Sequence, residues 1–158
     1  MSVIMELTQS EVRVCASLAL ERWLTKTGST DRPNYAQGKS EGRLEHDLNA
    51  GIRANVCEWA VAKHWGFAWN VPWYPNSEHP KRSDLADVGI NGEVRSVRTF
   101  NSIPYWPKDE GRVIIGCKVL DDNYFSVVEI YGVFEPLFEP EYADGKGGYR
   151  MPIERLKL

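Results

Sequence analysis

The chain has 158 residues and a formal net charge of −3 at pH 7; 42% of its residues are hydrophobic and 26% are charged. This length suits one domain with a full-sized core, so we expect a single domain over residues 1–158. The slight acidic excess excludes a protein that coats nucleic acid through bulk positive charge, but it is compatible with an enzyme that contacts a few phosphates through a local basic patch and a metal.

The first predicted helix begins at a capping box. Thr8 and Glu11 are three residues apart, as the N-cap and N3 residues of such a box are. Apolar residues then recur at helical spacing, which predicts a helix over residues 9–26. A polar loop follows over residues 28–42. A second helix is predicted from about residue 41 to residue 64 or 65, where Gly66 ends it.

Glu58 has an unexpected position on the second helix. At about 100° per residue, it falls at the edge of the apolar stripe beside Gly51 and Ala54, whereas Asn49 and Arg53 lie on the opposite, solvated face. Burying an unpaired carboxylate costs several kcal/mol or more, so Glu58 needs a metal or a cation as its partner. The small neighbours would allow a strand or a substrate to approach it.

The second half of the chain is predicted to be rich in strands. We expect loops over residues 66–83 and 100–111, and strands over residues 86–90, 93–99, 112–120, 124–134 and 149–153. The last range contains Pro152, which a sheet tolerates only at an edge or an end. The predicted fold class is α+β, with N-terminal helices followed by a mixed, mainly antiparallel sheet.

The Asn-Gly pair at residues 91–92 is the strongest hairpin signal in the chain. A two-residue turn at this pair would point Asp87 away from Glu93. A three-residue loop, with Gly92 left-handed in a G1 bulge, would pair Asp87 with Arg95 and turn all three charged side chains to one face. We predict the bulged register, with this hairpin as the active element.

Cysteine usage and the lack of long apolar runs indicate the compartment. Cys15, Cys57 and Cys117 are odd in number and widely spaced, which predicts free buried thiols in a reducing compartment. No apolar run approaches the roughly 18 residues of a membrane span, and the N-terminus lacks the layout of a signal peptide. We therefore expect a cytoplasmic protein that does not enter a membrane.

The charged residues of the helix and the hairpin suit one kind of chemistry. Glu58, Asp87 and Glu93 would repel one another at close range unless a cation lay among them. Carboxylate oxygens are ligands that Mg²⁺ and Mn²⁺ prefer, and both ions also bind substrate phosphate. Arg95, two residues after Glu93, would hold the attacking water or offset phosphate charge. This combination favours phosphodiester hydrolysis.

The order of these residues resembles the PD-(D/E)XK nuclease superfamily. That signature is a helix glutamate, then an aspartate, then Glu-x-basic on a β-hairpin. The runs Glu-Trp-Ala-Val-Ala-Lys at residues 58–63, Ala-Asp-Val-Gly at 86–89 and Glu-Val-Arg at 93–95 look more closely like a group of small, largely uncharacterised bacteriophage proteins of that type. The likeness covers roughly residues 5–100, with a weaker echo at residues 149–156.

The resemblance implies a metal-dependent DNase with a restriction-endonuclease-like core, encoded by a phage and acting in the host cytoplasm. Glu58, Asp87 and Glu93 would bind Mg²⁺ (or Mn²⁺), and Arg95 would occupy the position of the family's lysine. Contacts to DNA are expected from four further basic residues: Lys63, Lys81, Arg82 and Arg98.

Arg95 leaves a second function open. Arginine stays protonated and cannot act as a general base, although it can orient water or bind phosphate. Lys63, just over one helical turn beyond Glu58, could replace the family's lysine. In the alternative, the site has lost catalysis, and the protein binds a host or phage protein, or nucleic acid, without cutting it.

Overall fold

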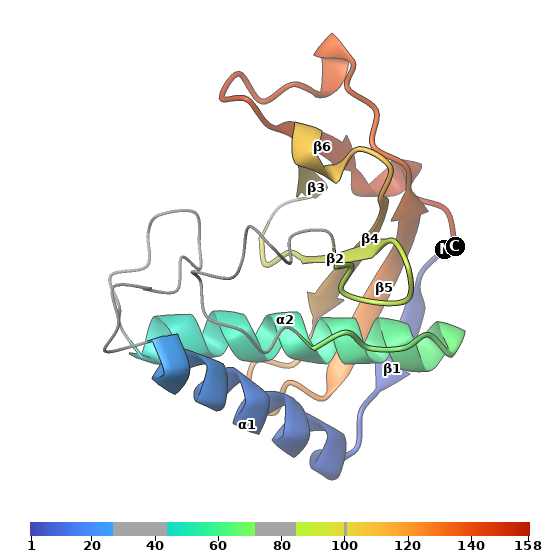
Figure 1. Cartoon of the computed structure of the whole chain (residues 1–158). Coiled ribbons are helices and arrows are strands. Elements are labelled where there is room, and N and C mark those ends of the chain that lie inside the picture. Colours follow the sequence, from blue (N-terminus) through green and yellow to red (C-terminus); the bar gives the residue numbers. More distant parts are fainter. Residues whose placement is uncertain (27–43, 72–84, 100) are drawn as a thin grey trace.

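The structure of the protein, a computed structural model, describes residues 1–26, 44–71, 85–99 and 101–158 (Figure 1). Its elements are β1 (Val3–Glu6), α1 (Gln9–Lys26), α2 (Leu44–Trp65), β2 (Gly92–Ser96), β3 (Ser102–Tyr105), η2 (Pro107–Asp109), β4 (Val113–Val119), β5 (Val127–Phe134), η3 (Pro140–Tyr142), β6 (Tyr149–Pro152) and η4 (Ile153–Arg155). The elements labelled η are short 3-10 helices. The fold is α+β, as the sequence predicts.

The capping box that the sequence predicts starts α1. The backbone N–H of Glu11 donates to Thr8 Oγ1 over 3.2 Å, and the backbone N–H of Thr8 donates to Glu11 Oε2 over 2.7 Å. These reciprocal bonds satisfy two of the donors that a helix N-terminus leaves unpaired. The helix predicted over residues 9–26 is confirmed. α2 begins at Leu44 among the described residues, and its predicted start near residue 41 lies outside them.

The main sheet has four strands in the order β1-β5-β4-β2. β5 is antiparallel to both β1 and β4, whereas β2 runs parallel to β4, with Gly92 opposite Val113. α2 contacts all four strands and α1 packs on α2, so α2 lies between α1 and the sheet (Figure 1). β3 and β6 form a separate two-stranded antiparallel sheet.

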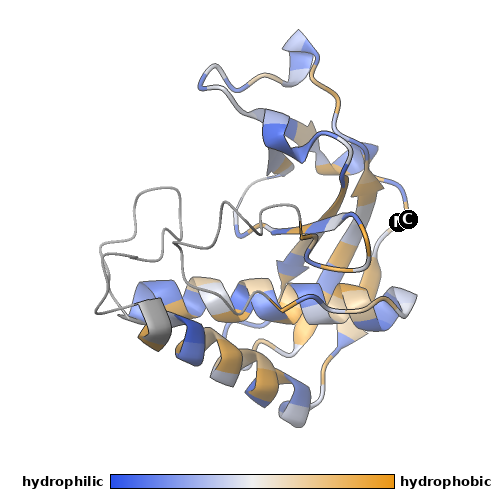
Figure 2. Ribbon diagram, in the orientation of Figure 1, coloured by the Kyte–Doolittle hydropathy of each residue, from blue (hydrophilic) through white to orange (hydrophobic). Residues whose placement is uncertain are grey.

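Apolar side chains pack on both faces of the main sheet. On the face that α2 covers, Ile115 and Ile130 belong to a core with the apolar residues of that helix. On the other face, Ile114 packs with Ile103 of β3 and Met151 of β6. Figure 2 shows hydrophobic residues along α2 and the strands of the main sheet. The small sheet therefore covers the part of the main sheet that the helices leave open.

Two strands of the structure differ from the sequence prediction. β3 lies within the predicted loop over residues 100–111, and β1 precedes the first predicted element. Both strands are four residues long, and their partners β6 and β5 are distant in the sequence. Strands this short carry little periodic signal, so the non-local pairing decides their conformation.

Arg53 is a second difference, because it is buried rather than solvated. Its side chain is 8% exposed, and its guanidinium lies 4.9 Å from the centre of the Phe125 ring. Arg53 also donates to Asn49 Oδ1 over 2.9 Å and pairs with Asp122 in the β4–β5 turn. The turn thus covers a face of α2 that the sequence assigns to solvent.

The predicted free thiols are confirmed. Cys15, Cys57 and Cys117 are all buried and unpaired by disulfides. Burial raises the pKa of Cys15 to about 12 and that of Cys117 well above its usual value, so both remain protonated. Among the described residues, no helix is both long and apolar enough to cross a membrane.

The substitution Gly132→Ala tests the crossing of β5 by the C-terminal segment. Gly132 has a φ of +140°, and a Cβ there would lie 2.7 Å from the carbonyl oxygen of Lys157. We expect a loss of about 1–3 kcal/mol in the free energy of unfolding, measured by urea denaturation. Gly145→Ala is the control, because its φ is +75° but nothing lies within 4 Å of the added Cβ. An equal loss in both variants would contradict the predicted contact.

Candidate functional site

The turn before β2 sets the position of the acidic residues. Val88 and Gly92 exchange two backbone hydrogen bonds, each of 3.1 Å, which leaves residues 89–91 as the loop. The left-handed residue is Gly89, with a φ of +60°, and the predicted left-handed bulge at Gly92 is wrong. Glycine tolerates a left-handed conformation without a steric penalty, so Gly89 and Gly92 could each adopt it, and tertiary contacts decide between them.

Residues 68–70 supply those contacts, because they form hydrogen bonds with the backbone of residues 86–89. The N–H of Asn70 donates to the carbonyl of Asp87 over 2.9 Å, and that of Gly89 donates to the carbonyl of Ala68 over 2.8 Å. The Asn70 amide side chain also donates to the carbonyls of Ala86 and Gly89, over 3.0 and 2.8 Å. The strand predicted over residues 86–90 is accordingly reduced to isolated bridges.

Asp87 still faces the side chains that the sequence groups with it. With residues 89–91 as the loop, Asp87 lies across from Glu93, so the predicted pairing of Asp87 with Arg95 is wrong. The residue opposite Asp87 is thus Glu93 and not Arg95, two positions away. Because side chains two residues apart on a strand lie on the same face, Asp87 keeps the predicted face. The Asp87 carboxylate accepts the backbone N–H of Val94 over 2.8 Å, which fixes it to the start of β2.

α2 brings Glu58 into the same region. Glu58 is 6% exposed, and Trp69 Nε1 donates to its Oε2 over 2.7 Å. The backbone of Trp69 bridges that of Val88, so one residue ties Glu58 to the turn. A Cβ on Gly51 would lie 3.3 Å from Ala19, so this small residue admits α1 and not the strand or substrate that the sequence suggests.

β2 contributes Glu93 and Arg95, which point into a set of ion pairs. Arg95 Nη1 lies 3.2 Å from Glu93 Oε2, and Arg95 Nη2 lies 2.9 Å from Asp109 Oδ1. Arg112 Nε lies 3.8 Å from the other oxygen of Glu93. Arg95 is therefore held between two carboxylates from different parts of the chain.

The carboxyl groups of the cluster share one electrostatic environment. Burial, followed by the charge of Asp87, raises the pKa of Glu58 well above its usual value, while Arg22 opposes the shift. Burial also raises the pKa of Asp87, although Arg95 opposes it. Burial and the charge of Asp87 raise the pKa of Glu93 to about 7. The raised pKa values mean that the fold disfavours the charged forms of these three acids: Glu58, Asp87 and Glu93.

The donor set fits a hard divalent cation, because the charge of Asp87 raises the pKa of both Glu58 and Glu93, and a positive charge among the three carboxylates would offset this repulsion. Among the described residues, however, no group of three His, Cys, Asp or Glu side chains is arranged to hold a metal ion. Trp69 already occupies an oxygen of Glu58, and Arg95 and Arg112 face the oxygens of Glu93. Coordination of one ion would require these side chains to rearrange.

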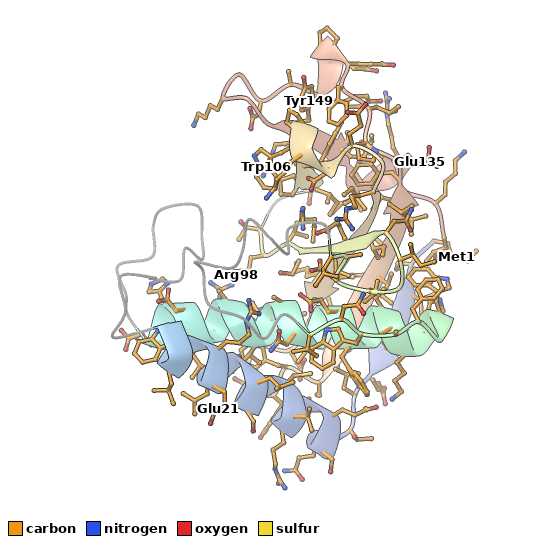
Figure 3. The ribbon with its side chains drawn as sticks, in the orientation of Figure 1. Met1, Glu21, Arg98, Trp106, Glu135 and Tyr149 are labelled. Atoms are coloured by element: carbon orange, nitrogen blue, oxygen red, sulfur yellow. The ribbon has the colours of Figure 1, made fainter. Side chains whose placement is uncertain are left out.

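The two additional basic residues of the sequence prediction that the structure describes make their contacts outside this cluster. Lys63 Nζ is 3.0 Å from the Glu11 carboxylate and 3.5 Å from the carbonyl of Glu6, so this α2 side chain contacts the start of α1. Arg98, labelled in Figure 3, is exposed and donates to Asn49 of α2. Lys81 and Arg82 lie outside the described residues.

The site contains residues that sequence reasoning did not assign to it, namely Arg22, Trp69, Asp109 and Arg112. Arg22 of α1 lowers the pKa of both Glu58 and Asp87. Arg22 is a charged residue within the apolar stripe of its helix, and the same kind of misplaced charge identifies Glu58 on the second helix. Asp109 and Arg112 lie in the connection from β3 to β4; Asp109 falls in the predicted loop over residues 100–111, and Arg112 is the first residue of the predicted strand over residues 112–120.

No family model, curated protein or solved structure matches the chain. The site therefore has to be interpreted from its own geometry.

Lowering the pH should stabilise the protein through Glu93. The pKa of Glu93 is about 7 in the folded chain and near 4.5 in the unfolded one. Its contribution is fully present below about pH 4.5 and is lost as the pH rises through 7, at up to about 1.4 kcal/mol per pH unit. We expect the free energy of unfolding, measured between pH 5 and 8, to fall less steeply with rising pH in Glu93→Gln than in the parent. Parallel curves for the two proteins would contradict this assignment.

Proposed function

We propose that the protein is a metal-dependent phosphodiester hydrolase of PD-(D/E)XK type that cleaves DNA. The observation that carries the proposal is the convergence of Glu58, Asp87 and Glu93 in one cluster, although they come from α2, a turn and β2; Glu58 is buried, and the other two are half-buried. A purely structural core has no need of three neighbouring acids, because apolar residues of similar volume serve as well or better. The phage source and the cytoplasmic location implied by the resemblance belong to the same proposal.

Mg²⁺ or Mn²⁺ would be held by the carboxylates of Glu58, Asp87 and Glu93. Such an ion, when bound, lowers the pKa of a water ligand and polarises the phosphoryl group. The chain's own residues prepare these ligands: Trp69 orients Glu58, and the backbone N–H of Val94 orients Asp87. Fixed partners of this kind keep metal ligands in place.

Arg95 would contact the phosphate or the attacking water. Its Nε is buried without a hydrogen-bond partner among the described residues, and a buried donor of this kind gains from an additional oxygen acceptor. Arg95 stays protonated, because Asp109 and Glu93 raise its pKa against the effect of burial. It would therefore donate and not accept a proton in the reaction.

Two observations favour a second function, in which the same site binds a partner without cutting it. The side chain of Lys63 extends from α2 to the start of α1, where Glu11 neutralises it, and this makes it less suited to replace the family's lysine. Both Nη groups of Arg95 already pair with carboxylates, and these pairs weaken its attraction for a phosphate. A nuclease-fold protein that binds a host or phage protein, or nucleic acid, is the resulting alternative.

Asp87→Ala should abolish cleavage. We expect Mg²⁺- or Mn²⁺-dependent hydrolysis of DNA to fall by at least about a hundredfold, because the variant loses a charge that holds the metal. The measurement is the rate of cleavage of single- and double-stranded DNA at matched ion concentration. Glu154→Ala, which removes an exposed acid in η4, is the control and should cleave like the parent. An Asp87→Ala protein as active as the parent would refute the nuclease proposal.

Binding of Mn²⁺ distinguishes a metal-dependent enzyme from the non-cutting alternative. We expect calorimetry to detect Mn²⁺ binding at sub-millimolar concentration and at least about a tenfold loss of affinity in Glu93→Ala. Binding should be stronger at pH 8 than at pH 5.5, because protons compete with the ion for Glu93, whose pKa is about 7. No binding by the parent, or binding that Glu93→Ala leaves unchanged, favours the second function.

A further inference from the structure

We infer that Asp109 is a positioning residue of this site, which holds Arg95 at a fixed distance from the metal-binding carboxylates. The inference rests on the proposed function, because it concerns the carboxylates assigned there to the ion. Asp109 lies in η2, on the connection from β3 to β4, and is 3% exposed. It is the second carboxylate partner of Arg95, at 2.9 Å.

Asp109 is anchored by its own turn and cannot follow Arg95. Its Oδ2 accepts the backbone N–H of Trp106 over 2.9 Å, and its own backbone N–H donates to the Trp106 carbonyl over 2.9 Å. The backbone N–H of Arg112 donates to the Asp109 carbonyl over 3.0 Å. Arg95, by contrast, reaches the turn through a long side chain with several rotatable bonds. The position of the guanidinium is therefore set by Asp109.

The two bonds of Arg95 divide its charge between two acids. Nη1 donates to Glu93 and Nη2 donates to Asp109, so Glu93 receives one N–H group and not the parallel pair that arginine makes with a single carboxylate. The Trp106 ring, labelled in Figure 3, lies 5.7 Å from the guanidinium carbon and limits its movement further. Without Asp109, the guanidinium would be free to turn onto Glu93 and Asp87.

This division has a functional consequence. An arginine paired fully with Glu93 competes with a cation for that carboxylate, whereas an arginine held by Asp109 competes less. Asp109 thus limits Arg95 to one hydrogen bond with Glu93, so a metal ion that binds this carboxylate has fewer contacts to displace. The role differs from that of a ligand, because Asp109 acts only through Arg95.

The substitution Asp109→Asn tests the inference. Asparagine retains an oxygen for the Trp106 N–H, but its amide N–H₂ group is no acceptor for Arg95. We expect the affinity for Mn²⁺, measured by calorimetry, to fall by about tenfold. In an Arg95→Gln background, the same substitution should change the affinity by less than about twofold, because no guanidinium is left to position. An equal loss in both backgrounds would overturn the inference, since it would reduce Asp109 to a distant negative charge.

A second measurement is independent of metal and of activity. The Nε–H signal of Arg95 in a nitrogen-15 NMR spectrum is identified by its absence in Arg95→Gln. In the parent it should exchange slowly with water and lie apart from the signals of exposed arginines, and in Asp109→Asn it should join them. An unchanged signal in Asp109→Asn overturns the inference. Asp144→Asn, an exposed acid that accepts backbone N–H groups of Lys146 and Gly148, is the control and should leave both measurements unchanged.

The two measurements separate the inference from the proposed function. If the parent binds no Mn²⁺, the proposed function fails, and the NMR signal alone decides whether Asp109 positions Arg95. If the parent binds Mn²⁺ and the signal moves as expected while the affinity stays the same, Asp109 orders Arg95 without serving the metal, and the inference fails.

Discussion

The burial of several acidic side chains beside one another is the constraint on which the arrangement of this protein depends. Glu58 is almost completely buried, and the negative charge of Asp87 raises its pKa more than that of Glu93 does. Taking such groups out of water costs several kcal/mol each unless hydrogen bonds and positive charges offset the loss. The fold supplies these partners from three directions: an indole N–H from Trp69, a guanidinium from Arg22 of α1, and Arg95 from β2. Neutral groups alone would leave the acids uncompensated.

The parallel pairing of β2 with β4 explains how the later part of the chain reaches the cluster. Parallel neighbours need a long crossover connection, because the chain must return to the end of the sheet from which it started. Here the connection carries β3 and η2, and it ends where the backbone N–H of Val113 donates to the Asn91 carbonyl over 2.9 Å. Asp109 and Arg112 therefore arrive beside the first residues of β2. An antiparallel hairpin partner for β2 would have left them elsewhere.

The sequence predicts those parts of the fold that local patterns determine. The capping box starts α1 where expected, the apolar run over residues 112–120 contains β4, and the predicted edge strand near the C-terminus contains β6. The helix wheel also identifies Glu58 as a misplaced charge. Patterns of this kind depend on residues a few positions apart, so one chain segment is enough to interpret them.

Features that depend on contacts between distant segments were not predictable in the same way. The turn before β2 contains glycines at its two ends, and either could be the left-handed one. Hydrogen bonds from residues 68–70 select Gly89, and nothing within the turn indicates that choice. Arg53 is similar, because a helix wheel places it in solvent until the β4–β5 turn covers it. The connectivity of the sheet decides both cases.

An arginine at position 95 suits the arrangement of this site better than a lysine would. A lysine ammonium is a single point charge on a flexible stem, whereas a guanidinium is planar and presents separate N–H groups in fixed directions. Only the second can bond Glu93 with one nitrogen and Asp109 with another while its central carbon lies 5.7 Å from the centre of the Trp106 ring. Arg95 therefore links β2 to the β3–β4 connection as well as facing the acids. A lysine would not present separate nitrogens to Glu93 and Asp109, so Arg95 and the buried Asp109 depend on each other for their positions.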